Sequence, residues 1–200
     1  MRKTVLSCSL LLILTALFSL PTCASEKQQP YYGFFRSELG QNFKKLTHNI
    51  FGFSIDIPST WVFGVHGTPP LAVVLIYPEG MNTAQLSSDY EMIEIGRLPF
   101  NGIDLNDAQR LTLKGMTVKH PNLAVLTEPN KHILNGKLAV SFVFQWPSRT
   151  GLMVTEYVTL VQAEGSIRSL AVRSTRSDIV ARRNFYDLLL GTFSPFNPIY

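Results

Sequence analysis

Four histidines are the side chains of this sequence best suited to metal binding or proton transfer: His48, His66, His120 and His132. A metal site on one helix commonly uses two ligands three or four residues apart, and no pair of these histidines has that spacing. His120 precedes a proline and His132 follows a lysine, in segments that are typical of loops. The spacing therefore favours surface histidines, with a metal ligand or a general base as the alternatives, and it predicts no cofactor.

The acidic residues form no clear catalytic pair. Glu91 and Glu94 lie three residues apart in an alternating segment, which places their carboxylates on opposite faces of a strand. Glu128 and Glu156 could meet across a sheet, although no pattern requires it. No Gly-x-Ser-x-Gly nucleophile motif occurs, and "GTPP" at 67–70 is not followed by the Gly-Lys-Ser/Thr of a phosphate loop. The sequence therefore favours a protein that is not an enzyme.

A series of arginines is the most suggestive polar feature. Arg168 and Arg173 fall on opposite faces of one predicted strand. Arg176, Arg182 and Arg183 could gather at the start of the last predicted helix, where they would attract an acidic partner or a lipid headgroup. The alternative is a solvated helix face. We treat these three arginines as predicted partner contacts.

Both ends of the predicted domain are rich in aromatic residues. "YYGFF" begins with Tyr31 and Tyr32, and "FSPFNPIY" contains Phe196 and Tyr200. Aromatic side chains near chain ends commonly pack against a sheet edge, but exposed ones form the kind of apolar patch that marks a partner surface. These four residues are therefore added to the predicted partner contacts.

Residues 1–24 have the layout of a secretory signal peptide. Arg2 and Lys3 form a basic start, residues 5–20 are apolar and uncharged, and small residues precede the expected cleavage after Ala24. The apolar stretch is shorter than the about 20 residues of a membrane span, which favours cleavage over a permanent anchor. The predicted location is therefore the periplasm or the exterior of the cell.

The two cysteines, Cys8 and Cys23, both lie in this leader. "LPTC" at 20–23 resembles a bacterial lipobox, so lipidation of Cys23 could tether the domain to a membrane. If the leader is removed instead, the mature domain has no disulfide and no cysteine nucleophile.

The 18 basic and 14 acidic residues give a formal charge of +4, and loss of the two basic residues in the leader leaves 16 basic residues, or +2. This small excess predicts no nucleic-acid partner.

The rest of the sequence predicts the elements that must position these side chains. Residues 25–47 form a polar lead-in that continues into an amphipathic helix pattern at Phe35, Leu39, Phe43 and Leu46. Alternating or continuous apolar runs then predict strands. These strands are at 51–57, from 61 onward, and at 71–78, 89–99, 122–129, 138–146, 152–162 and 167–175. "NG" at 135–136 predicts a two-residue hairpin turn.

Two further helices follow from periodicity and end signals. One begins after Asp104 as N-cap and ends at His120 and the following proline. The other runs from about 178 to 190, with Ser177 as N-cap and Gly191 as C-cap. Its predicted buried stripe is Ala181, Phe185, Leu188 and Leu189. The sequence thus predicts one α+β domain at 48–200, with an antiparallel sheet of about six to eight strands flanked by two or three helices.

This order of elements resembles the PsbP-like fold. The resemblance rests on the opening "FGFSIDIPSTW", on a mid-chain helix followed by a meander ending in "SIRSLAVRSTRSD", and on the closing "FYDLLLGTF" with Phe193. It covers about residues 48–194. Proteins of this fold include extrinsic proteins of photosystem II, a Ran-binding import factor and exported bacterial proteins of the DcrB type. The resemblance implies a domain that binds partners, and it carries no functional residue over to this sequence.

The sequence therefore predicts an exported cell-envelope protein that acts as a non-catalytic binding or assembly module, with an unidentified envelope protein as partner. The alternative is a periplasmic enzyme or small-ligand binder that uses a cleft between sheet and helices. A deep pocket in which His66 or His120 meets a carboxylate would favour this alternative.

Overall fold

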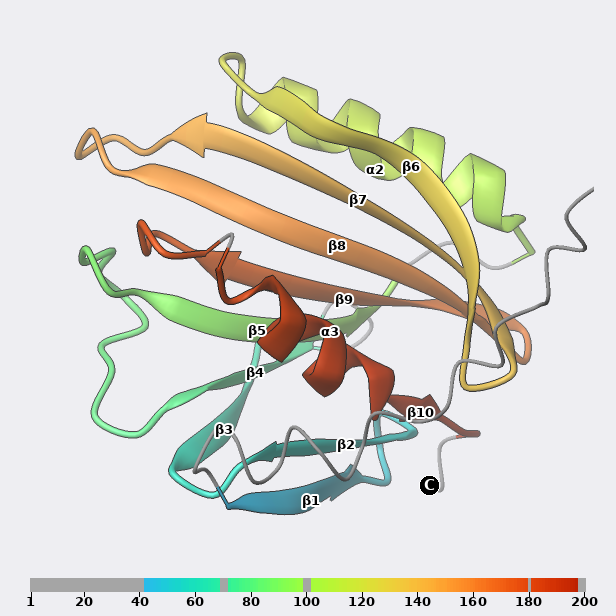
Figure 1. The fold of residues 1–200 in the computed structure, drawn as a ribbon. Helices are drawn as coiled ribbons and strands as arrows, with labels where there is room; N and C mark the ends of the chain where they lie inside the picture. The colour runs from blue at the N-terminus through green and yellow to red at the C-terminus, as the bar shows by residue number, and fades with distance from the viewer. Residues whose placement is uncertain (1–41, 69–71, 99–101, 180, 198–200) are drawn as a thin grey trace, which may run out of the picture. The chain divides into compact units, whose positions relative to one another are not determined.

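The computed structural model describes residues 42–68, 72–98, 102–179 and 181–197, which contain two antiparallel sheets and two helices (Figure 1). The large sheet has seven strands in the order β3-β4-β5-β9-β8-β7-β6, and the small sheet has three in the order β1-β2-β10. The strands are β1 (Phe43–His48), β2 (Phe53–Pro58), β3 (Trp61–His66), β4 (Val73–Pro78), β5 (Glu91–Arg97), β6 (Ala124–Leu134), β7 (Lys137–Pro147), β8 (Met153–Ala163), β9 (Ser166–Ser174) and β10 (Ser194–Pro195). The helices are α2 (Leu105–Lys119) and α3 (Arg183–Gly191). These elements confirm the predicted α+β class.

The large sheet buries apolar side chains on both of its faces, because alternate residues of each strand point to opposite sides. On the face that we call the α3 face, Ile93 and Val172 pack with α3 and with β2. On the opposite α2 face, Phe142 and Phe144 pack with Leu105 and other residues of α2. Figure 1 shows α3 across the near side of the sheet, and α2 lies against β7 and β8 on the other side. Neither helix of the described segments is long and apolar enough to cross a bilayer.

Strand β2 shows that the opening motif builds the fold. Phe53, Ile55 and Ile57 have no exposed surface, whereas the intervening Ser54 and Asp56 are half-buried. β1 pairs with one edge of β2 and β10 with the other, so residues from both ends of the described chain meet on this strand. The strand ends at a proline, which cannot continue the ladder of hydrogen bonds.

Helix α2 confirms the predicted start and end signals. The Asp104 carboxylate accepts a hydrogen bond of 2.8 Å from the backbone N–H of Asp107, which satisfies one of the free amides of the first turn. At the other end, the backbone N–H of His120 donates to the carbonyl of Met116 at 2.8 Å. His120 is thereby fixed as the C-cap of the helix.

Helix α3 differs from its prediction in both its start and its buried face. It begins at Arg183 rather than near 178, and its N-cap is Arg182 with no side-chain cap, so Ser177 does not cap it. The buried residues are Phe185, Tyr186, Leu189 and Leu190, whereas Ala181 is exposed and Leu188 is half-buried. Gly191 is the last helical residue, and Thr192 is the C-cap. The stripe is shifted because Tyr186 points into the interior to meet a buried carboxylate.

Strand β1 replaces the last part of the predicted amphipathic helix. Phe43 and Leu46 belong to this strand, and Leu46 faces Ile55 of β2. Pairing with an open edge of β2 satisfies the backbone here, and this long-range contact overrides a weak local helix pattern. The small sheet therefore includes part of the predicted 25–47 segment, and residues 25–41 of that segment lie outside the described residues.

The hairpin between β6 and β7 confirms the predicted turn and adds a second role for it. Asn135 and Gly136 both have positive φ, at 47° and 75°, as a two-residue hairpin turn requires. The Asn135 side-chain amide also donates to the carbonyl of Gly191 at 2.8 Å and to that of Phe193 at 2.7 Å. The turn thus satisfies carbonyl groups at and just beyond the end of α3.

Candidate functional site

The predicted arginine contacts lie around the start of α3, and each is paired with a carboxylate of the chain. Arg176 donates two hydrogen bonds of 2.8 Å to Asp178. Arg183 lies 3.7 Å from Asp187, one turn further along the helix, and both side chains are mostly exposed. Arg182 reaches into the protein and does not extend from the surface with the other two. Partner binding by Arg176, Arg182 and Arg183 stays a prediction.

Arg182 belongs to a buried polar cluster on the α3 face. Its guanidinium donates to both carboxylate oxygens of Glu91 at 3.0 and 3.1 Å and lies 4.8 Å from the ring centroid of Phe185. The Tyr186 hydroxyl donates to the same carboxylate. Burial and the charge of Glu91 raise the pKa of Tyr186 well above its ordinary value. The hydroxyl therefore stays protonated, and the cluster joins α3 to β5.

A second charged cluster lies on the opposite face, as the spacing of Glu91 and Glu94 predicts. Arg173 donates to the buried Glu156 at 2.8 Å and lies 3.6 Å from Glu94. Glu156 is therefore paired with an arginine, while Glu128 is exposed on β6 with β7 between the two strands. The structure does not bring these two glutamates together as a catalytic pair.

The histidines do not gather at one place. His48 packs against the rings of Phe51, Phe53 and Phe63, and His66 is exposed at the end of β3. His132 lies in strand β6 rather than in the predicted loop, because β6 extends to the hairpin turn. Within the described segments, no three histidine, cysteine or acidic side chains are grouped to hold a metal ion.

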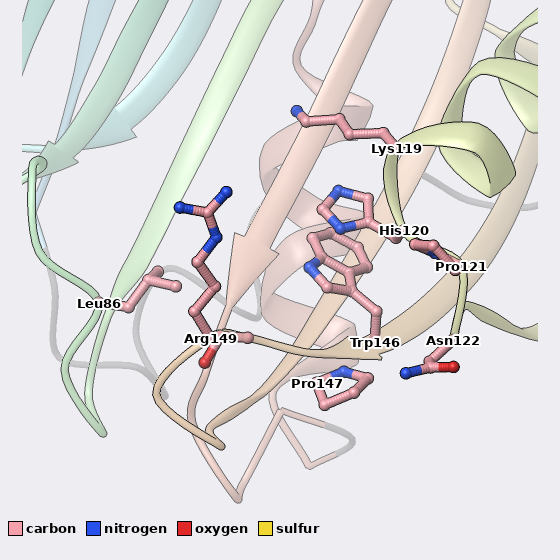
Figure 2. A pocket seen from close by; sticks show the side chains of 9 residues that line it. Leu86, Lys119, His120, Pro121, Asn122, Trp146, Pro147 and Arg149 are labelled. Carbon is pink, nitrogen blue, oxygen red and sulfur yellow. The ribbon is translucent and has the colours of Figure 1, made fainter.

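A cavity of about 410 Å³ opens between the end of α2 and the turn that joins β7 to β8. Its lining includes Leu86, Lys119, His120, Trp146, Pro147 and Arg149. Figure 2 shows the rings of His120 and Trp146 stacked, with their centroids 4.2 Å apart and their planes at 28°. In the same view, the charged ends of Lys119 and Arg149 lie on one side of these rings. No acidic side chain lines the cavity.

This cavity only partly matches the pocket expected for the alternative prediction, an enzyme or small-ligand binder. A pocket exists at His120, as that alternative requires, but His120 meets a tryptophan there rather than a carboxylate. Sequence reasoning missed Trp146 and Arg149, because alternation assigned the first to the core and "PSRTG" indicated only a turn. One sequence signal could have pointed to this site. Lys119 and His120 stand at the end of the predicted mid-chain helix, and Trp146 stands at the end of a predicted strand with Arg149 shortly after it.

The remaining predicted contacts lie at or beyond the ends of the described segments. Phe196 is half-buried, and its backbone N–H donates to the carbonyl of Gly52 at 2.8 Å. Cys23, Tyr31, Tyr32 and Tyr200 lie outside the described residues. Lipidation at the cysteine and partner contacts by the tyrosines therefore stay predictions.

The surroundings of two histidines predict a pH dependence of stability. Burial lowers the pKa of His48, and burial with the charges of Lys119 and Arg173 lowers the pKa of His120. The unfolded chain therefore binds protons on these histidines before the folded protein does. Their contribution to stability is complete above the ordinary histidine pKa of 6.5 and is lost as the pH falls below it.

We expect the urea midpoint of the protein to be lower at about pH 5.5 than at about pH 7.5, on either side of the ordinary histidine pKa. The variant carrying His48→Gln and His120→Gln should show a smaller difference between these two conditions, because it lacks both groups. The same difference in the variant and the unaltered protein would show that these histidines are not responsible.

The comparisons with known proteins identify the fold. No protein-family model and no curated protein matches the sequence. Among solved structures, the cyanobacterial PsbP protein (CyanoP) of Synechocystis sp. PCC 6803 is 9% identical with a TM-score of 0.57, covering 78% of this chain and 94% of its own. The Ran-binding protein Mog1p of Saccharomyces cerevisiae is 11% identical with a TM-score of 0.54, covering 78% and 97%. LpqN of Mycobacterium tuberculosis, described as involved in cell envelope biogenesis, is 13% identical with a TM-score of 0.49, covering 81% and 95%.

At these identities, the likeness concerns the fold and not the activity. The first two of these matches each cover 78% of this chain, while the DcrB-type branch stays a prediction. The chain has a PsbP-like α+β fold.

Proposed function

We propose that this chain is an exported cell-envelope module that binds a protein partner without catalysis, and that the partner docks on strand β6. The proposal includes removal of the leader at 1–24 or, in its lipid-anchored form, attachment through Cys23. The observation that carries the binding role is an edge strand with exposed apolar side chains.

Strand β6 is the last strand of the large sheet, and its outer edge pairs with no other described strand. Its apolar residues Val125, Leu126 and Ile133 are 47%, 52% and 66% exposed. Leu138 of β7 lies directly opposite Ile133 and is 42% exposed. An unpaired edge with apolar side chains is a common place for another chain to add a strand, since the backbone supplies hydrogen bonds and the side chains supply apolar contact.

The pairing of β6 with β7 limits where such a strand can add. Register shifts lie between Val125 and Thr127 and between Thr127 and Asn130, so the first half of β6 is irregular. From Asn130 to Leu134 the register is continuous. Bulges bend a strand away from a partner, which leaves the regular second half as the better docking segment. Lys131 lies in this half, and it favours a partner strand that carries an acidic side chain.

The comparisons support a protein partner in general. Mog1p is described as a Ran-binding protein, so one domain of this fold acts by binding another protein. At 11% identity, neither that partner nor its contact residues transfer to this chain. For this chain we propose an envelope protein that presents an extended segment with apolar side chains and a negative charge.

Replacing Ile133 with aspartate is expected to reduce partner binding by about tenfold or more, because it places a charge in the apolar docking segment. The control is Val118→Asp, which changes another exposed apolar residue, 76% exposed on α2. A photo-crosslinking residue at position 130, which is exposed in the same half of β6, should give one discrete adduct in intact cells when no other residue is changed and when Val118→Asp is added. Adding Ile133→Asp instead should give much less of this adduct. The mass of the mature N-terminus from the same cells separates cleavage after Ala24 from lipidation of Cys23.

Ile133 is largely exposed, so both variants should unfold within about 0.5 kcal/mol of the unaltered protein. An adduct that persists unchanged in Ile133→Asp would contradict docking on β6. Turnover of a small substrate by the purified protein, without any adduct in cells, would contradict the non-catalytic binding role.

A further inference from the structure

The cavity at the end of α2 has no part in the partner docking proposed above. Two segments supply most of its lining, residues 119–122 at the end of α2 and residues 146–149 at the end of β7. Its position on the α2 face is set by the stacking of His120, the C-cap of α2, on Trp146 of β7. Two segments that are distant in sequence are therefore held together by a ring contact.

Arg149 differs from the other arginines of the described segments, because each of those interacts with another residue of the chain. These are Arg97, Arg110, Arg168, Arg173, Arg176, Arg182 and Arg183. Among the described residues, neither Arg149 nor Lys119 is paired with an acidic side chain, and none lines the cavity around them. Two cationic groups at one cavity without a neutralising carboxylate leave a positive potential there.

The inner wall of the cavity includes the stacked rings of His120 and Trp146. Trp146 is 6% exposed, so the tryptophan is fixed in the core and holds the stacked His120 ring in place. The Nε2 atom of His120 is buried and has no hydrogen-bond partner among the described residues. Because Nε2 is already closed off from solvent, an apolar group can pack on this ring without burying a further polar atom. Burial also lowers the pKa of His120, so the ring is neutral at neutral pH.

We propose that this cavity binds a small oxyanion ligand, a carboxylate or a phosphate monoester that carries a compact apolar group. Arg149 and Lys119 hold the anionic group, and the apolar part packs against His120, Pro147 and Leu86. A guanidinium fits two oxygens of a carboxylate or phosphate in parallel hydrogen bonds, and an ammonium adds a point charge. The volume of about 410 Å³ is at the lower end of ligand pockets, which suits a single-ring compound rather than a nucleotide or a peptide.

The two tryptophans of the protein allow a direct test with an internal reference. Trp146 lines the cavity, whereas Trp61 lies on the α3 face against Phe185. The indole N–H signals of the purified, isotope-labelled protein are followed by NMR during titration with phenyl phosphate, benzoate or the neutral benzyl alcohol, each up to about 10 mM. We expect the Trp146 signal to move and saturate with the phosphate or the carboxylate, and the Trp61 signal to stay in place. Benzyl alcohol should produce no saturable shift.

Arg149→Gln is expected to raise the dissociation constant about tenfold or more, because it removes the charge-assisted hydrogen bonds. The matched control is Arg110→Gln, which removes an exposed arginine paired with Asp107 on α2 and should change the constant by less than about twofold. An unchanged Trp61 signal shows that each variant is folded. The proposal is overturned if the Trp146 shift stays linear with both anions, if benzyl alcohol reproduces it, or if Arg149→Gln binds as the unaltered protein does. None of these outcomes bears on docking at β6, which Ile133→Asp tests separately.

Discussion

Glu91→Ala is expected to destabilise the protein by about 3 kcal/mol, measured by urea unfolding followed by circular dichroism. Glu91 is 3% exposed and accepts hydrogen bonds from Arg182 and Tyr186. Its removal leaves a half-buried guanidinium without its counter-charge and a buried hydroxyl without its acceptor. The cost of unpaired buried groups exceeds the net benefit of the bonds themselves.

Two further variants test the cause of that loss. Arg183→Gln breaks an ion pair with Asp187 in which both side chains are about 60% exposed, and it should cost about 0.5 kcal/mol or less. The triple variant Glu91→Leu, Arg182→Met, Tyr186→Phe replaces the whole cluster with apolar groups and should recover most of the stability lost in Glu91→Ala. If Glu91→Ala cost no more than Arg183→Gln, the buried cluster would not hold α3 on the sheet.

The same cluster shows where reasoning from the sequence stops. Alternation placed Glu91 and Glu94 on opposite faces correctly, because strand periodicity is a local property. The pairing of Glu91 with Arg182 joins residues 91 positions apart, and nothing local marks it. Arg182 was therefore grouped with its sequence neighbours as a surface contact, although it reaches into the protein.

The helices, turns and strands that were predictable are likewise those that depend on neighbouring residues. The cap at Asp104 and the turn at Asn135 depend on a few adjacent residues, and both were predictable. Strand β1 was predicted as helix because its identity depends on pairing with β2. The cavity could not be predicted, because it exists only where the end of α2 meets the end of β7 and stacks His120 on Trp146.

Phe193→Ala is expected to cost about 3–5 kcal/mol in the same unfolding measurement. Phe193 has no exposed surface, and its ring lies 5.8 Å from that of Phe53, which is also fully buried. It stands between α3 and β10, next to Thr192, whose hydroxyl accepts a hydrogen bond of 2.8 Å from the backbone of Asp56 in β2. Removing the ring leaves a cavity at the point where α3 meets the small sheet, and the surrounding elements can fill it only in part.

A double-variant cycle with Phe53→Ala tests whether the two rings act together. Aromatic pairs at this distance contribute about 0.5–1.5 kcal/mol beyond the area that they bury, so the double variant should lose less than the sum of the single losses. The control is Phe63→Ala, which removes a ring that is 48% exposed and should cost about 1 kcal/mol or less. This contact joins the opening motif to the closing one, which are two of the three features that carry the resemblance to the PsbP-like fold. Strictly additive losses, or a loss at Phe193 no larger than that at Phe63, would show that the small sheet is stabilised elsewhere, for instance by the hydrogen bonds from Asn135 to the end of α3.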